Sequence, residues 1–262
     1  ETGDIHLSAP IATDDPADLT NKLGPVDVIL FMVKTYDTQT AAEQCLPLLS
    51  DDTAVITFQN GIQSVETLSQ VLGVSHVLGG VANISAIIEE PGVIRHYNQL
   101  QILRFGELDD RSSARSTAFL EACQGSGIEA VILQNTLAGL WTKFIFLAST
   151  SAANCLARGD MGLIRTEGPL RRLTTDLVTE ATAVAIARGI KLPSDQVEQT
   201  MTLIDGLPAT MKTSMLAALE RGERLEADWL SGHVARMGDE LGVPTPTHRA
   251  AYAALFPWRN LG

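Results

Sequence analysis

The chain of 262 residues is 45% apolar and 19% charged, a composition that supports a sizeable hydrophobic core and excludes an intrinsically disordered protein. Its formal net charge of -12 argues against nucleic-acid binding, which requires clustered lysine and arginine side chains. A small anionic substrate is compatible with this charge if a few cations gather at its site.

Cysteine usage and hydropathy predict a cytoplasmic protein. The three cysteines are far apart in the sequence and form neither a zinc motif nor a disulfide framework: Cys45, Cys123 and Cys155. No secretory signal peptide starts at Glu1. The apolar run at residues 144–157 is interrupted by Ser, Thr and Asn and is shorter than the ~20 residues that a membrane span needs. We therefore expect no contact with a membrane.

The first half of the sequence alternates strand and helix patterns. Residues 26–33 (VDVILFMV) form a nearly continuous apolar run, typical of a strand covered on both faces, and residues 53–58 predict a second strand. A helical pattern that begins at Thr38 lies between them. Two further strand patterns, HVLGGVA and LQILRFG, flank a turn signal at Pro91 and Gly92. Strands that alternate with helices predict a parallel sheet.

The second half has long helical patterns and no clear strand. The expected helices cover residues 138–157, 170–188, a segment from about 193, and residues 214–221, 225–241 and 247–255. We therefore predict an α/β protein in which a Rossmann-like parallel sheet domain, residues 1–134, precedes an all-α domain, residues 135–262.

Polar residues follow the two predicted strands at the edge where ligands bind in open α/β sheets. Lys34 comes directly after the first strand, and Gln59, Asn60 and Gly61 follow the second. Because helical periodicity follows the Asn-Gly pair, we expect a strand-to-helix turn rather than a hairpin, with Gly61 allowing a ligand to approach the backbone. Asn60 and Lys34 are candidate ligand contacts, although an ordinary turn residue and a solvated lysine stay open.

Lys143 is the one charged residue between Ala130 and Ala157. In one interpretation, its side chain extends to the surface along its own methylene groups or pairs with a buried carboxylate. In the other, it lies at the rim of a cleft where Gly139 and small polar residues leave room for a ligand. The ammonium group could then donate a proton or stabilise negative charge on an oxygen. The pattern alone leaves both interpretations open.

Ser214 and Glu226 each have an ordinary explanation beside a functional one. Ser214 suits the N-cap of the helix that follows it. Glu226 could be an exposed carboxylate on a helix or could lie beside an apolar ridge. His233 and His248 lack metal-ligand spacing, so we expect structural or surface histidines and no metal site. No motif pairs a nucleophile with a base, which disfavours acyl transfer.

Five segments occur in an order that is typical of one family: VDVILFMVKTYDT, FQNGI, LWTKFIF, TSMLAALERGERLEADWLSG and GVPTPTH. From about Gly24 to the C-terminus, the chain resembles the ketopantoate reductase (2-dehydropantoate 2-reductase) family. The resemblance implies an N-terminal Rossmann domain, a helical C-terminal domain, and NADPH-dependent reduction of ketopantoate to pantoate on the route to coenzyme A.

The resemblance also implies roles for individual residues. Lys143 matches the catalytic lysine that stabilises the developing alkoxide and supplies its proton. Asn60 matches the asparagine that contacts both nicotinamide and substrate, and Ser214 matches a substrate-binding serine. Glu226 matches a glutamate near cofactor and substrate.

Two further residues correspond to cofactor contacts in the family. Lys34 matches the lysine at the end of the "VK" strand. Ala86, or a residue next to it, matches an alanine that follows the "GG" pair. NADP is the cofactor that the resemblance implies.

The sequence departs from the family pattern in two ways. Asparagines often stand four and eight positions after the catalytic lysine, where this chain has Leu147 and Ser151. We keep Ser151 as a candidate substrate contact, but Leu147 leaves room for another 2-keto acid. The glycine-rich phosphate loop is absent from the sequence, so the first βαβ unit is expected before Glu1. A related 2-keto acid or hydroxyacid reductase, a cofactor-deficient non-catalytic homologue and a possible homodimer stay open.

Overall fold

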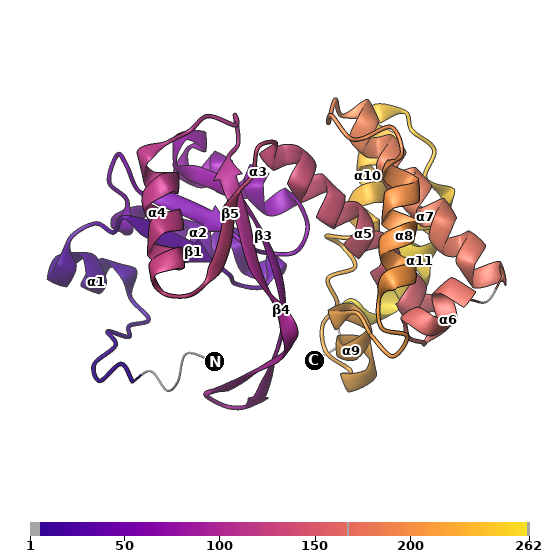
Figure 1. The fold of residues 1–262 in the computed structure, drawn as a ribbon, viewed down its shortest axis with the longest axis horizontal. Helices are drawn as coiled ribbons and strands as arrows, with labels where there is room; N and C mark the ends of the chain where they lie inside the picture. Colours follow the sequence, from indigo (N-terminus) through magenta and orange to yellow (C-terminus); the bar gives the residue numbers. More distant parts are fainter. Residues whose placement is uncertain (1–5, 167, 261–262) are drawn as a thin grey trace. The chain divides into compact units, whose positions relative to one another are not determined.

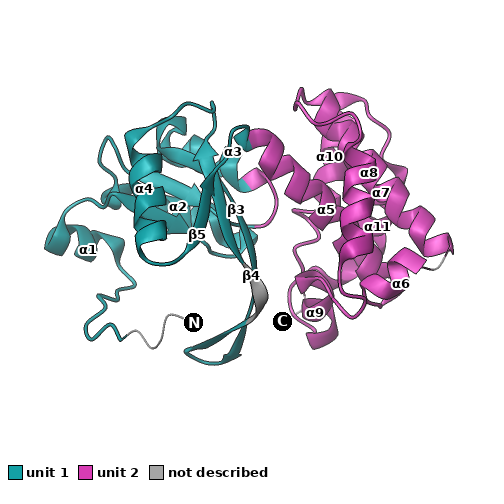
Figure 2. Ribbon diagram, viewed as in Figure 1, with its two compact units in different colours: residues 1–59, 64–136 teal, residues 60–63, 137–262 magenta. Residues whose placement is uncertain are grey.

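The structure is a computed structural model that describes residues 6–166 and 168–260, and for residues 97–100 it describes the backbone alone. The chain divides into two compact units (Figure 2). Unit 1 comprises Glu1–Gln59 and Ser64–Thr136, and unit 2 comprises Asn60–Gln63 and Leu137–Gly262. The short segment Asn60–Gln63 thus groups with the helical part of the chain, although the strand before it belongs to unit 1.

Unit 1 is built on a sheet whose strands lie in the order β1-β2-β3-β4-β5 (Figure 1). The strands are β1 (Val28–Phe31), β2 (Ala54–Thr57), β3 (Val77–Glu90), β4 (Val93–Glu107) and β5 (Glu129–Ile132). β1, β2 and β3 are parallel neighbours, and β4 and β5 also pair in parallel. This parallel-dominated sheet, followed by helices, confirms the predicted fold class.

The sheet is nevertheless mixed, because β3 and β4 pair antiparallel as a long hairpin. A parallel pair needs a crossover connection of a dozen or more residues, whereas Pro91 and Gly92 alone join these two strands. The predicted parallel sheet thus includes one antiparallel pair, and the other strand pairs are parallel. Beyond the residues that pair with β2 and β5, the hairpin continues outward and exposes a row of isoleucines: Ile84, Ile87, Ile88 and Ile94.

The core of unit 1 lies around β2, whose four residues are all buried, as expected of a strand covered on both faces. The helices of the unit are α1 (Pro16–Leu23), α2 (Thr38–Cys45), α3 (Gln63–Leu72) and α4 (Ala114–Gly125). Phe119 of α4 packs against Phe105 of β4 with ring centroids 4.9 Å apart. By contrast, β1 is an edge strand of the described sheet and Leu30 is exposed, so its predicted burial on both faces was wrong.

Unit 2 is helical throughout its described residues. Its helices are α5 (Thr136–Ala157), α6 (Met161–Thr166), α7 (Gly168–Ala187), α8 (Gln196–Gly206), α9 (Ser214–Arg221), α10 (Ser231–Leu241) and α11 (Pro246–Leu255). A buried cluster that includes Ala152 and Ala153 of α5, Leu177 of α7 and Ala251 of α11 forms a core. None of the described helices reaches the length and hydropathy that a bilayer span requires.

The helix expected over residues 225–241 begins only at Ser231. Residues before it form a turn, in which the carbonyl of Glu226 accepts hydrogen bonds from the backbone N–H groups of Trp229 and Leu230, both at 3.1 Å. Glu226 therefore lies on a turn that precedes α10 and not on a helix, which corrects the predicted position of this carboxylate.

Candidate active site

Gln59, the residue before Asn60, is bonded to the segment that follows β1 in unit 1. The buried Gln59 side chain donates hydrogen bonds from Nε2 to the carbonyl of Val33, at 2.8 Å, and to Oγ1 of Thr38, at 2.9 Å. These two bonds tie the carboxyl end of β2 to the segment that follows β1. Gln59 is thereby held in place within unit 1, directly before Asn60 in the sequence.

Gly61 brings this turn against the turn that carries Glu226. Its φ of 88° lies in the region that side chains rarely adopt, and a Cβ at this position would lie 3.5 Å from the backbone oxygen of Trp229. A strand-to-helix turn follows β2, since α3 begins two residues after Gly61, as the sequence predicted. Asn60 and Glu226 are consequently carried by two turns that touch.

Lys143 lies on α5 with most of its side chain removed from water. Burial lowers the pKa of this ammonium to about 8, and the charge of Glu226 acts in the opposite direction. The electrostatic interaction with Glu226 places these two groups within reach of each other across more than eighty residues of sequence. Unit 2 thus brings together the lysine, the glutamate and the Asn60 turn.

Farther along α5, several polar groups are buried without a partner. Ser149, Ser151 and Asn154 have no exposed surface, and the hydroxyls of both serines and Nδ2 of Asn154 have no hydrogen-bond partner among the described residues. The other amide atom of Asn154, Oδ1, accepts a hydrogen bond from the backbone N–H of Thr213 at 3.3 Å. Ser151 lies about two helical turns beyond Lys143.

Ser214 is exposed and is the first residue of α9. The N-cap is Thr213, whose hydroxyl accepts a hydrogen bond from the N–H of Leu216. The predicted capping role of Ser214 was therefore wrong by one residue. The Ser214 hydroxyl does not cap the helix. Its role as a substrate contact stays a prediction.

The two candidate cofactor residues, Lys34 and Ala86, lie in unit 1 and are both exposed. Lys34 follows Val33, the residue whose carbonyl accepts a hydrogen bond from Gln59, so its backbone lies near the carboxyl end of β2 in unit 1. Ala86 lies on the outer hairpin, seven residues beyond Gly79, the last residue of β3 in register with β2. That separation is roughly 23 Å along an extended strand, so the structure does not bring Ala86 to the end of β2.

His233 and His248 are both buried, so neither is a surface residue. Both ring nitrogens of the fully buried His248 have partners, since one lies 3.2 Å from Oγ of Ser231 and the other 2.9 Å from the carbonyl of Leu177. Burial lowers the pKa of His248 and of His233 to about 4. No cluster of three potential metal ligands occurs among the described residues.

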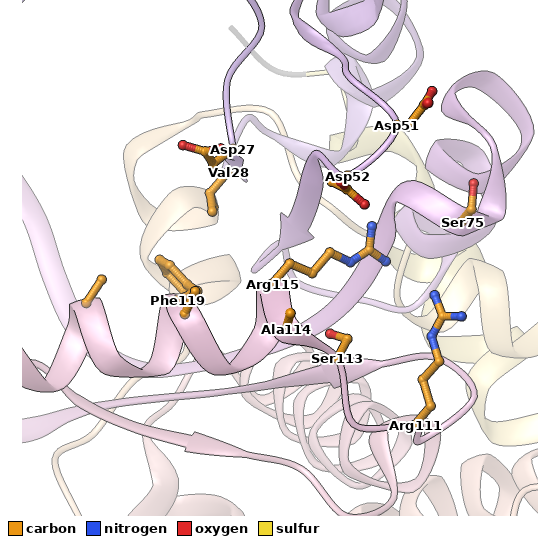
Figure 3. Close-up of a pocket in the computed structure, with 12 residues that line it drawn as sticks. Asp27, Val28, Asp51, Asp52, Ser75, Arg111, Ser113, Ala114, Arg115 and Phe119 are labelled. Carbon is orange, nitrogen blue, oxygen red and sulfur yellow. The ribbon is translucent and has the colours of Figure 1, made fainter.

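A separate cavity of about 880 Å³ lies in unit 1 (Figure 3). Asp27, Asp52 and Ser75 line it, and each of them precedes a strand of the sheet. The cavity is therefore at the amino ends of the parallel strands, opposite the edge where Gln59 and Lys34 lie. Figure 3 shows Arg115 of α4 extending toward Asp52, but this arginine is already engaged by Glu107. We therefore place the candidate site in unit 2 rather than here.

Sequence reasoning missed three residues that build the site. Gln59 was visible as part of the "QNG" segment, but nothing in the pattern indicated its bonds to Val33 and Thr38. Trp229 has no predicted role, whereas its backbone oxygen faces Gly61 in the structure. Asn154 looked like one more small polar residue of an apolar helix.

Comparisons with known proteins point to one family. The family described as ketopantoate reductase PanE/ApbA matches residues 1–110, and its C-terminal part matches residues 135–256. The 2-dehydropantoate 2-reductase of Halobacterium salinarum is 27% identical over 247 residues, which are 94% of this chain and 79% of that protein. The crystal structure of a PanE/ApbA family ketopantoate reductase from Ralstonia eutropha JMP134 is 27% identical, with a TM-score of 0.83 over 94% of this chain and 79% of that chain.

A more distant structure shares the fold alone. A D-mandelate dehydrogenase solved with NADH and anilino(oxo)acetate is 17% identical, with a TM-score of 0.80 over 90% of this chain and 77% of that chain.

Proposed function

Because the chain belongs to the ketopantoate reductase PanE/ApbA family of oxidoreductases, we propose that it reduces 2-dehydropantoate to pantoate with NADPH, a step of coenzyme A biosynthesis. The observation that carries this proposal is the environment of Lys143. Burial lowers the pKa of its ammonium group to about 8, the charge of Glu226 acts on it, and the Asn60 turn belongs to the same unit. A general acid works best when its pKa is near the working pH.

The proposed roles follow from the chemistry of these side chains. Reduction of the keto carbon puts negative charge on the carbonyl oxygen, and the Lys143 ammonium stabilises this charge and transfers its proton to the oxygen. Glu226 keeps Lys143 protonated, because its negative charge raises the pKa of the lysine. Asn60 orients the substrate through an amide that both donates and accepts, while Ser214 and Ser151 donate hydroxyl hydrogen bonds to it.

The residues of this chain fit the nicotinamide end of the cofactor. The chain offers an amide at Asn60, a turn without a side chain at Gly61 and an exposed cation at Lys34, all at the carboxyl ends of parallel strands where such cofactors bind. We propose Lys34, Asn60, Ala86 and Glu226 as cofactor contacts. When bound, the cofactor supplies the hydride.

Domain roles and setting are part of the proposal. Residues 1–134 would bind the cofactor, and residues 135–262 would hold the substrate and the general acid. The cysteines among the described residues are free, which suits a reducing compartment such as the cytoplasm. A homodimer stays a prediction.

The second candidate is a reductase for another 2-keto acid, and Leu147 favours it. This apolar side chain lies one turn from Lys143 on the same face of α5, so the helix offers fewer polar contacts to the hydroxyl of ketopantoate. If ketopantoate is the substrate, Leu147→Asn should keep or raise kcat/KM for it relative to an unhydroxylated 2-keto acid.

The proposal is tested by following oxidation of NADPH, and separately of NADH, with ketopantoate and a panel of other 2-keto acids. Saturable turnover that is fastest with ketopantoate and NADPH supports the first function. A different preferred acid supports the second. If no 2-keto acid is reduced with either cofactor, both functions are wrong and the chain is a non-catalytic member of the family.

A further inference from the structure

Asn154 occupies an unusual position in the core of unit 2. It has no exposed surface and lies three turns beyond Lys143 on the same face of α5, since eleven residues return to nearly the same angle of a helix. Its immediate neighbours in sequence include the fully buried Ala152 and Ala153, which belong to an apolar cluster. A polar side chain at such a place requires an explanation.

One of the two polar atoms of the Asn154 amide has a hydrogen-bond partner among the described residues. Oδ1 accepts the hydrogen bond from the backbone N–H of Thr213, whereas Nδ2 has no acceptor among the described residues. Turning the amide over would set an NH₂ group against the Thr213 N–H, so this bond determines the orientation. An unpaired buried donor is unfavourable, and an apolar side chain would avoid it. The hydrogen bond to Thr213 is therefore what an asparagine provides at this position and an apolar residue would not.

Thr213 is the residue on which the start of α9 depends. It caps the helix, and the next residue is Ser214, the proposed substrate contact. The loop before it is held at Ala209 and Met211, whose carbonyls accept hydrogen bonds from α6 at 2.7 Å and 2.9 Å. The bond to Asn154 holds this loop one residue before Ser214, and it ties the start of α9 to the helix that carries Lys143.

We propose that Asn154 is a positioning residue that sets the orientation of Ser214 toward substrate by holding the backbone of Thr213. This inference rests on the proposed function of the site. Asn154 makes no contact with substrate in this proposal. It acts through Ser214, so its effect must vanish when Ser214 is removed.

The test compares two substitutions of Asn154. Asn154→Leu removes the acceptor, and we expect KM for the 2-keto acid to rise about tenfold while kcat changes less than threefold. Asn154→Asp keeps an oxygen for Thr213 at a helix N-terminus, where a carboxylate is tolerated, and should restore KM to within about threefold of the native value. Ser149→Ala, which removes an equally buried hydroxyl roughly 140° away around α5, serves as the control and should leave KM unchanged.

A double-mutant cycle with Ser214→Ala separates positioning from a general loss of structure. If Asn154 acts through Ser214, Asn154→Leu should add less than a twofold change in KM to the Ser214→Ala variant. Full additivity of the two substitutions would overturn the proposal. Equal KM values for the Leu and Asp variants would overturn it as well.

Hydrogen exchange provides a measurement that does not depend on activity. Asn154→Leu should accelerate exchange of the peptide that contains Thr213 and Ser214, whereas Asn154→Asp and Ser149→Ala should not. If no 2-keto acid is reduced but this exchange pattern is found, the proposed function fails while the anchoring of Thr213 stands. Unchanged exchange in the Leu variant would show that Asn154 does not hold this loop.

Discussion

The carboxylate of Glu226 and the ammonium of Lys143 interact, although one lies on a turn before α10 and the other on α5. Burial and the charge of Glu226 act on the pKa of Lys143 in opposite directions. Burial disfavours the charged form and lowers the pKa of Lys143 to about 8, and Glu226 moderates this change. The pair leaves the lysine charged at neutral pH and able to release its proton, which is the property that a general acid requires.

Replacing Lys143 by alanine should reduce kcat by about 10²–10⁴-fold, because general acid catalysis is typically worth that much. The dissociation constant of the nicotinamide cofactor should change little, since the proposed role concerns the carbonyl oxygen of the substrate. Steady-state kinetics and a fluorescence titration with NADPH measure the two quantities. Lys191→Ala, at an exposed lysine of the same unit, is the matched control and should retain full activity. Near-native turnover by the Lys143 variant would remove the basis of the mechanism.

The rate should depend on pH through Lys143. Because the protonated lysine is the active form, kcat should be constant below its pKa and should fall as the pH rises through about 8. Glu226 raises this pKa, so Glu226→Gln should lower it and move the fall in kcat to lower pH. A pH–rate profile of both proteins measures the shift. A shift toward higher pH would contradict the proposed interaction.

A side chain at Gly61 should strain the backbone. Gly61→Ala would put a Cβ on a residue with a φ of 88°, whereas its contact with the backbone oxygen of Trp229, at 3.5 Å, would be ordinary, so we expect a loss of about 1 kcal/mol in the free energy of unfolding and a higher KM for substrate. Gly206→Ala is the control, because a Cβ at this last residue of α8 meets nothing within 4 Å. Urea unfolding should show a lower midpoint for the first variant alone.

The helices and strands with strong periodicity could be predicted from the sequence, and α9 has the predicted bounds, residues 214–221. Four of the described helices and strands were missed: α1, α4, α6 and β5. The residues of α4 show almost no amphipathic pattern, although Ser113, which accepts a hydrogen bond from the N–H of Ser116, is a recognisable N-cap. β5 has four residues, too few for a periodic signal. The antiparallel β3–β4 pair was misjudged because an apolar run does not reveal the direction of its partner.

The candidate site also has parts that the sequence predicted and parts that it could not. Residue type and local context made Lys143 and Asn60 candidates, and the resemblance to the family supplied the expected roles of these two residues and of Glu226. Their proximity depends on contacts between distant segments, such as Gly61 with Trp229, which no local pattern contains. Asn154 could not be predicted for the same reason, since its partner Thr213 is 59 residues away in sequence.

The ion pair between Arg115 and Glu107 offers a test of the core of unit 1. Both carboxylate oxygens of the buried Glu107 accept hydrogen bonds from Arg115 at 2.8 Å. Burial alone would raise the pKa of Glu107, but the hydrogen bonds and charge of Arg115 outweigh it and the pKa is lowered. Arg115→Met would leave a buried carboxylate unpaired, so we expect a loss of about 3–5 kcal/mol in the free energy of unfolding at pH 7.

The pH dependence of this loss distinguishes an ion pair from simple packing. A carboxyl group with a lowered pKa stabilises the fold above its ordinary pKa, and this contribution disappears as the pH falls through the folded-state value. The difference in unfolding free energy between the native protein and Arg115→Met should therefore shrink in acid, where Glu107 is protonated in the variant. Arg95→Met is the control, because Arg95 and its partner Glu89 are both exposed, with 2.6 Å between their charged groups, and Arg95 is not among the groups that shift the pKa of Glu107. Such a surface pair contributes at most about 1 kcal/mol. A loss in Arg115→Met that is the same at every pH would mean that the arginine stabilises unit 1 by packing and not by its charge.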